Sequence, residues 1–205
     1  MALGDLSFKL YTDSNLTVAF GGSYQLTHYT DLSDNPQDFL LYFGSTETDR
    51  VLKTTTSPGV NNITVTPTSI ADAWEASTAY ILGDSVLPTT PNGYRYVCTT
   101  AGTSGGSEPT WPTTPIGQTV ADGTAVWTLT AAAHATTEIK LAATALGLDS
   151  ATAGAALSFG TSVSSGVVNA KQVHIRITNA VATASDNTGY PELGININDV
   201  TESAA

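Results

Sequence analysis

Charged side chains are scarce in this chain. Only 12% of its 205 residues are Asp, Glu, Lys or Arg, which is about half the usual share of a soluble domain. The seven basic residues stand singly, so no basic cluster is available to neutralise phosphates. We therefore expect no nucleic-acid binding and no attachment to an anionic membrane. The formal net charge of −11 comes from dispersed acidic residues and is explained by solubility.

Cysteine and long apolar runs are also scarce. Cys98 is the only cysteine, which excludes an intramolecular disulfide, and the alternating segment 94–98 around it predicts a small buried residue. No run reaches transmembrane length, so we expect no membrane insertion. Residues 1–5 lack the basic start and apolar run of a secretory signal. These features predict a protein that stays in the cytoplasm or leaves it by lysis.

Recognisable catalytic patterns are missing as well. The three histidines, His28, His134 and His174, lie far apart, and no pair has metal-ligand spacing. The glycine-rich segment 102–106 lacks the lysine and the helix of a phosphate-binding loop. No nucleophile elbow is present, and the carboxylates are dispersed. We expect no catalytic residues, no metal site and no cofactor.

Threonine and alternating hydrophobicity are abundant. The chain has 34 threonines, and this neutral β-branched residue suits strands that face water. The clearest alternation is in 173–178, where Val173, Ile175 and Ile177 share one face. The continuous apolar run 39–43 predicts a central sandwich strand. The other predicted strands are 6–11, 16–20, 24–29, 50–53, 62–66, 138–141, 157–159 and 193–198. Only the Ala-rich stretch 142–156 leaves room for a short helical turn.

The middle of the chain has a different composition. Residues 72–130 hold all three tryptophans and five of the nine prolines, and 102–118 is a long loop rich in glycine, serine and proline. Polar, strand-edge sequence flanks this region on both sides. We infer that a module at 72–130 is inserted in a loop of a host β-sandwich formed by 1–71 and 131–205.

The module carries a recognisable spacing of aromatic, glycine and proline residues. They are Trp74, Tyr80, Gly83-Asp84, Val86, Gly93-Tyr94, Tyr96, Pro109 and Trp127. This pattern resembles the small chitin-binding module, of carbohydrate-binding type, found on chitinases and cellulases. Asp122-Gly123 before Val126-Trp127 is similar to a variant common in phage tail and head proteins. The long loop 99–121 departs from the form borne by enzymes.

The flanking segments carry a second resemblance. Segments 39–44, 57–60, 63–67, 173–178 and 190–197 are similar to strands and turns of Ig-like sandwich domains in phage structural proteins. The implied fold is all-β, an Ig-like β-sandwich with a small β-rich module inserted in a loop.

Five aromatic residues are candidates for carbohydrate binding, because flat rings stack on sugar faces. They are Trp111, Trp74, Tyr80, Tyr94 and Trp127. Trp74 and Trp127 are better explained as the core of a module that has little else to bury. Tyr80 and Tyr94 are core positions of the family first and ligand candidates second. Trp111, between Pro109 and Pro112, leaves three roles open: packing on the prolines, contact with a partner protein, or stacking on a glycan.

Together the resemblances imply a non-enzymatic structural protein of the virion of a tailed bacteriophage, assembled in the host cytoplasm. Capsid decoration, as a cement protein on the particle surface, is the favoured role. The expected partners are other virion proteins, either the major capsid protein or tail proteins, and further copies of the chain. One alternative is a tail fibre or baseplate protein that adsorbs to host surface glycan. Another is a carbohydrate-binding accessory domain of a secreted hydrolase.

Overall fold

Antiparallel strands dominate the computed structural model, which describes residues 6–24, 33–179 and 193–205. Within these residues the helices are single turns, and the remaining regular structure is strand. The all-β fold class is therefore confirmed. Residues 25–29 of the predicted strand 24–29, His28 among them, and residues 190–192 of the predicted segment 190–197 lie outside the described residues.

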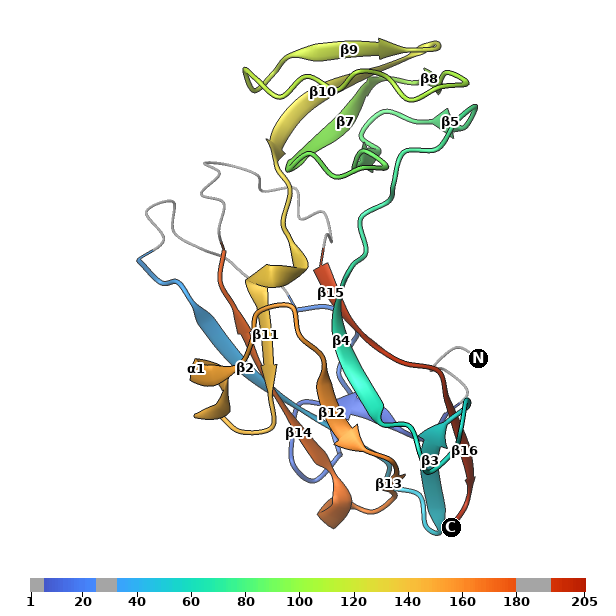
Figure 1. The fold of residues 1–205 in the computed structure, drawn as a ribbon, viewed down its shortest axis with the longest axis vertical. Helices are drawn as coiled ribbons and strands as arrows, with labels where there is room; N and C mark the ends of the chain where they lie inside the picture. Colours follow the sequence, from blue (N-terminus) through green and yellow to red (C-terminus); the bar gives the residue numbers. More distant parts are fainter. Residues whose placement is uncertain (1–5, 25–32, 180–192) are drawn as a thin grey trace. The chain divides into compact units, whose positions relative to one another are not determined.

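The described residues form two compact units. The first contains the described residues up to Thr68, together with Thr136–Asn179 and Gly194–Ala205, and the second contains Ser69–Ala135 and, of the later described residues, Leu193. The main segment of the second unit runs from residue 69 to residue 135, whereas the sequence predicted a module at residues 72–130. The chain passes from the first unit to the second after Thr68 and back again after Ala135 (Figure 1).

The first unit contains three sheets. One has four strands in the order β1-β2-β14-β11, and the other two have three strands each, β12-β4-β15 and β13-β3-β16. The strands are β1 (Lys9–Tyr11), β2 (Gln37–Gly44), β3 (Arg50–Thr54), β4 (Ile63–Ser69), β11 (Ile139–Ala142), β12 (Leu157–Gly160), β13 (Val163–Ser164), β14 (Lys171–Ile177), β15 (Leu193–Ile197) and β16 (Val200–Ala204). The short helices are η2 (Thr136–Glu138), α1 (Gly147–Ser150) and η3 (Val167–Asn169). The turn α1 lies inside the Ala-rich stretch where one helical turn was expected.

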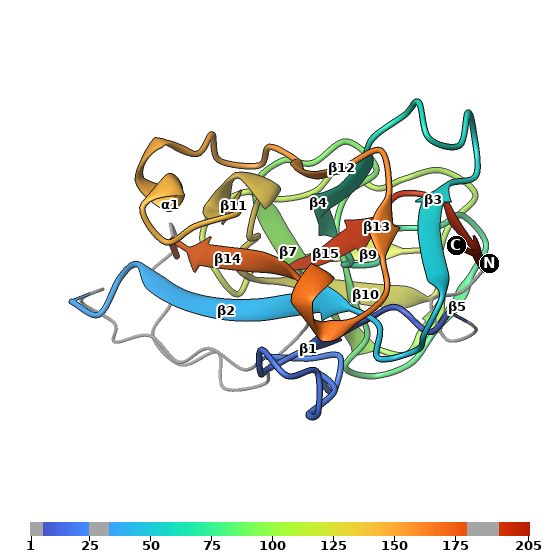
Figure 2. The same ribbon diagram turned by 90° about the horizontal axis from the view of Figure 1, so that it is seen from below.

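The core of the first unit lies between the four-stranded sheet and the shorter sheets. Strand β2 is flanked by β1 and β14, so the apolar run 39–43 is indeed central (Figure 2). Val173 and Ile175 of β14 are buried, which confirms the alternation read from the sequence. Phe43 of β2 stacks on Phe159 of β12 with ring centroids 5.2 Å apart, and this contact joins two sheets. The arrangement is sandwich-like.

The expectation of a strand at 16–20 is wrong. The carboxylate of Asp13 accepts hydrogen bonds from the backbone N–H groups of Asn15, Thr17 and Val18 at 2.6–3.2 Å, and a side chain that satisfies these donors competes with strand pairing. The hydrogen bond from the Val18 N–H is the largest cause of the lowered pKa of Asp13. Leu16 has φ of 57°, is 3% exposed and packs into the core of the first unit.

An ion-pair cluster fastens the outer face of the four-stranded sheet. Arg176 of β14 donates two hydrogen bonds of 2.7 Å to the two carboxylate oxygens of Asp38 on β2. Its third nitrogen donates to Asp149 of α1, also at 2.7 Å. The hydrogen bonds from Arg176 hold the pKa of Asp38 below its ordinary value of 3.8. The cluster therefore joins three elements that are distant in sequence.

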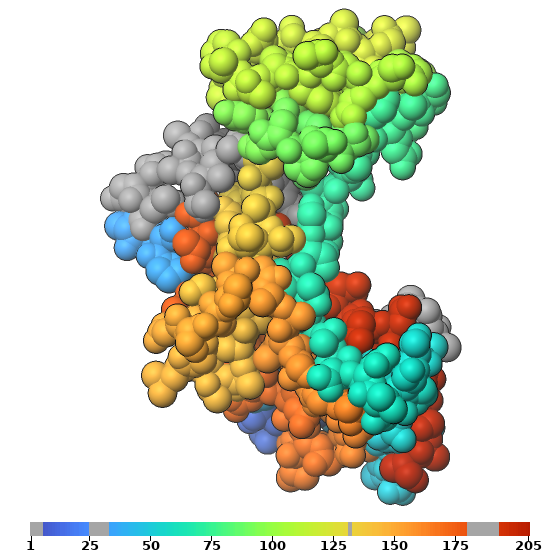
Figure 3. Space-filling view, viewed as in Figure 1, coloured from blue at the N-terminus to red at the C-terminus, as the bar shows by residue number. Residues whose placement is uncertain are grey.

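The second unit contains a four-stranded sheet in the order β6-β7-β10-β9 and a two-stranded sheet, β5-β8. Its strands are β5 (Ala79–Tyr80), β6 (Ser85–Val86), β7 (Tyr94–Thr100), β8 (Gly102–Thr103), β9 (Thr119–Asp122) and β10 (Ala125–Ala132). The long loop expected at 102–118 begins with β8 and otherwise contains no strand. We call this unit the module; its atoms are green to yellow in the space-filling view of Figure 3.

We predict that Leu52→Ala destabilises the first unit by about 2–5 kcal/mol, because Leu52 is fully buried on β3. The matched control is Leu146→Ala, since Leu146 is 85% exposed and its truncation leaves no cavity. Denaturant unfolding of the two variants measures the difference. Equal destabilisation by both substitutions would show that Leu52 does not belong to the core.

A second prediction concerns acid. The pKa of Asp38 is lower in the folded chain, so its contribution to stability is complete above the unfolded value of 3.8 and is lost as the pH falls through the folded value. Arg176→Gln removes this contribution. The unfolding midpoints of wild type and variant should therefore differ at neutral pH and converge in strong acid. A difference that is constant across the acid range would contradict the assignment.

Candidate functional site

The aromatic residues singled out in the sequence gather in the core of the module. The buried members are Trp74, Val86, Tyr96, Cys98, Trp127 and Leu129, and Tyr80, Tyr94, Trp111 and Val120 pack against them partly buried. Strands β7 and β10 place Cys98 opposite Trp127 and Tyr96 opposite Leu129, so these four side chains share one face of the sheet. Cys98 is 1% exposed, as expected for a small buried residue, and burial raises the pKa of its thiol.

A buried carboxylate organises this core. Asp122, at the end of β9, is only 4% exposed. Its Oδ2 accepts hydrogen bonds from the indole N–H groups of Trp74 at 2.7 Å and Trp127 at 3.0 Å. Its Oδ1 accepts the backbone N–H of Gly105 at 2.7 Å. One side chain thus fixes both buried tryptophans and the start of the long loop.

The turn after Asp122 approaches the neighbouring strand very closely. Gly123 has φ of 61°, and a side chain there would place its Cβ 2.3 Å from the carbonyl oxygen of Thr103. Only glycine fits both the backbone conformation and this contact. The Asp-Gly pair therefore serves to bring β8 and the β9–β10 turn together.

Trp111 is held against the edge of the core. Its ring lies 4.3 Å from that of Tyr96 and 6.0 Å from that of Trp127, measured between centroids. Its indole N–H donates to the carboxylate of Glu108 at 2.8 Å. Glu108 also accepts hydrogen bonds from the backbone and the hydroxyl of Thr89. Trp111 therefore has a defined orientation and is partly exposed.

The hydroxyl of Tyr96 ties the long loop to the core. It donates to the backbone carbonyl of Pro112 at 2.6 Å and accepts from the side-chain amide of Asn92 at 2.8 Å. Burial is the main cause of the raised pKa of Tyr96. Because Pro112 follows Trp111, this hydrogen bond positions the part of the loop that carries the partly exposed tryptophan.

The two other candidate aromatics are partly buried. Tyr80 meets Trp127 edge to face at 4.8 Å, and its hydroxyl accepts the backbone N–H of Glu75 at 2.9 Å. Burial is again the main cause of the raised pKa of Tyr80. Tyr94 begins β7 and packs against the same cluster. The structure thus brings all five sequence-predicted aromatics into one cluster, with Trp74 and Trp127 at its centre.

Three residues of this cluster were not singled out as site residues from the sequence: Asp122, Glu108 and Tyr96. Asp122 and Tyr96 stood in the recognised motif, yet their hydrogen-bond partners were not apparent. The Trp111–Glu108 spacing of three residues was the one local signal for the pair.

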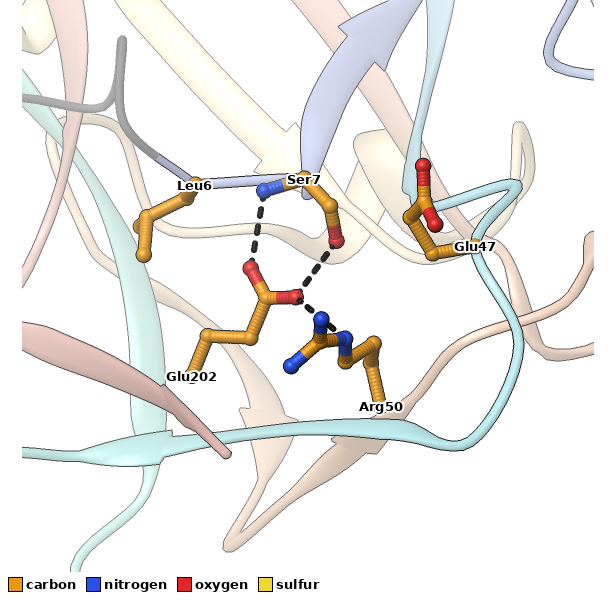
Figure 4. A pocket seen from close by; sticks show the side chains of 5 residues that line it. All are labelled: Leu6, Ser7, Glu47, Arg50 and Glu202. Atoms are coloured by element: carbon orange, nitrogen blue, oxygen red, sulfur yellow. Dashed lines mark hydrogen bonds and ion pairs between the residues drawn. The ribbon is translucent and has the colours of Figure 1, made fainter. Parts of the chain in front are cut away.

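The first unit contains a polar hollow of about 520 Å³. Figure 4 shows its lining residues: Leu6, Ser7, Glu47, Arg50 and Glu202. Glu202 accepts the backbone N–H of Ser7 at 2.8 Å and its hydroxyl at 2.7 Å, and the Nε of Arg50 lies 3.7 Å from the same carboxylate. These contacts join the first described segment to the last strand. We therefore interpret the residues that line the hollow as stabilising the fold and not as binding a ligand.

The described part of the chain contains neither a metal-binding cluster nor a membrane-spanning helix. No group of three or more His, Cys, Asp or Glu side chains there is arranged to hold a metal ion. No helix among the same residues has the length and apolarity to cross a membrane.

Comparison with protein-family models, with curated proteins and with solved structures finds no match to this chain. The resemblances to the chitin-binding module and to Ig-like phage domains therefore stay predictions from sequence.

We predict that Asp122→Ala unfolds the module or destabilises it by more than about 3 kcal/mol, because three buried donors lose their acceptor at about 1–3 kcal/mol each. Asp72→Ala is the control, since Asp72 is exposed in the same module. Thermal unfolding followed by tryptophan fluorescence reports on the module directly. Equal melting temperatures for the two variants would contradict the role of Asp122.

Proposed function

We propose that the chain is a non-enzymatic structural protein of a tailed-bacteriophage virion, and that its favoured role is capsid decoration. In this role the first unit attaches to the particle and the module is carried on it. The partners are the major capsid protein and further copies of the chain.

The observation that carries the proposal is that tryptophans of the recognised motif are buried in the core of the module. Trp74 and Trp127, which belong to the resemblance with a module common in phage particles, are 6% and 0% exposed and share the carboxylate of Asp122. Tryptophans that are buried and hydrogen-bonded in this way stabilise the fold of the module. They support a display or spacer module better than a module whose tryptophans form an open sugar platform.

The surface composition supports the same role. Charged residues are few and threonines many, so the strands present neutral hydroxyl groups to their surroundings. Contacts between many copies on a shell avoid the repulsion that dense like charges produce. The path of the chain also supports this role. Because the module is inserted in a loop, the strands of the first unit still pair into their own sheets.

A tail fibre or baseplate protein that adsorbs to glycan is the second candidate. One observation favours it: Trp111 is partly exposed and its ring is oriented by Glu108 and Tyr96. A preorganised aromatic ring is the element that a sugar face needs. In that case Trp111, rather than Trp74 or Trp127, contacts the ligand.

Copy number in purified particles of the phage that encodes the chain separates the candidates. Decoration predicts an amount of the same order as the major capsid protein, and binding of the purified chain to emptied heads that lack it. A few copies per particle would transfer the protein to the tail. Absence from the particle would overturn the proposal.

The glycan candidate has its own test within the same experiment. The full chain is mixed with host envelope polysaccharide, and Trp111→Ala is compared with Ile116→Ala, which alters a 59% exposed residue of the same loop. Loss of binding in Trp111→Ala alone would support adsorption. Under the decoration proposal the wild-type chain binds heads and leaves the polysaccharide unbound.

A further inference from the structure

The turn between β6 and β7 contains the one asparagine of the chain that a glycine follows, Asn92-Gly93. This dipeptide has a known intrinsic chemistry: the backbone nitrogen of the glycine can attack the side-chain amide carbon, because no side chain hinders it. The geometry points to Asn92 as a site of spontaneous deamidation. The aspartate or isoaspartate that forms there weakens the attachment of the loop that carries Trp111 to the core of the module.

The attacking group is accessible. Gly93 is exposed, has φ of 84°, and a Cβ built on it would meet no atom within 4 Å. Within the part of the chain that the structure describes, its N–H donates no hydrogen bond, whereas its carbonyl accepts the N–H of Ala133 at 3.0 Å. The nitrogen is therefore open to solvent base while the turn around it stays in place.

The amide carbon is activated by the fold. The backbone N–H of Tyr94 donates to Oδ1 of Asn92 at 3.0 Å, and this donor stabilises the negative charge that develops on that oxygen during attack. The same hydrogen bond fixes the side chain over its own turn, so the electrophile stays near the Gly93 nitrogen.

The reaction balances without any further reagent than water. Gly93 N loses its proton to solvent and bonds to Asn92 Cγ, and the bond from Cγ to Nδ2 breaks and releases ammonia. The resulting cyclic imide is opened by one water molecule. Cleavage at Cγ gives aspartate at position 92, and cleavage at the backbone carbon gives isoaspartate.

Deamidation reverses the direction of the hydrogen bond between the side chain of residue 92 and the hydroxyl of Tyr96. In the folded chain Nδ2 of Asn92 donates to the hydroxyl of Tyr96, which in turn donates to Pro112. A carboxylate at position 92 has no hydrogen to donate and accepts more strongly than a backbone carbonyl. The Tyr96 hydroxyl therefore turns toward the carboxylate, and Pro112 and the adjacent Trp111 lose that anchor.

A second Asp/Asn-Gly pair in the same module provides an internal contrast. Asp122 precedes Gly123, but its carboxylate is 4% exposed and engaged by three N–H donors, and Gly123 is crowded by Thr103. Closure of a ring there requires unfolding. We expect isoaspartate at position 92 and none at position 122.

The test is incubation of the full chain in mildly alkaline buffer, followed by peptide mass mapping and enzymatic isoaspartate detection. A synthetic peptide of residues 90–97 gives the rate for the unrestrained sequence. Conversion of Asn92 at least as fast as in the peptide supports the proposal, because the Tyr94 N–H favours attack on the amide carbon. Slower conversion than this overturns it, because the fold then protects the site. Asn92→Gln is the matched control, since its longer side chain would have to close a larger ring.

The release of the loop is measured separately. Hydrogen exchange of residues 104–118 is compared in wild type, Asn92→Asp and Tyr96→Phe. Faster exchange in both variants, with exchange in β14 of the first unit unchanged, is the expected result. Wild-type exchange in Asn92→Asp would overturn the coupling between the modification and the loop.

Discussion

The module depends on one buried carboxylate. Asp122 accepts hydrogen bonds from Trp74, Trp127 and the backbone of Gly105, so the two largest buried side chains and the start of the long loop share one anchor. A unit this small has little apolar area with which to fix its side chains. Hydrogen bonds to a charged acceptor add directional contacts of greater strength than neutral pairs. The position of the aromatic cluster, including the partly exposed Trp111, follows from this anchor.

The long loop is organised by hydrogen bonds rather than by strands. Glu108 orients Trp111, and the Tyr96 hydroxyl holds Pro112. Each contact joins the loop to the core through one side chain, so the loop is well defined in the intact module and sensitive to single chemical changes at its base. This combination of order and sensitivity suits a segment that meets a partner, whether that partner is a particle protein or a polysaccharide.

Prediction from sequence succeeded where one face of a strand is buried. The alternation of 173–178 and the apolar run 39–43 both correspond to strands, because burial forces a period of two or a continuous run. It failed at 16–20, where Asp13 takes the backbone donors that a strand would use. It left Trp111 undecided because the partner residues Tyr96 and Trp127 lie on other strands. The role of Asp122 was hidden for the same reason, since Trp74 is 48 residues away.

The nested path of the chain imposes an order on synthesis. In the first unit β2 pairs with β14, β3 with β16 and β4 with β15, so each of these strands waits for a partner made after the module. All strand pairs that the structure describes in the module lie within Ser69–Ala135. On the ribosome the module can therefore complete its sheets while the earlier strands of the first unit still have open edges. The edge of β2 closes once β14 has emerged, and the edge of β3 closes once β16 has emerged, when Glu202 of β16 also reaches Ser7.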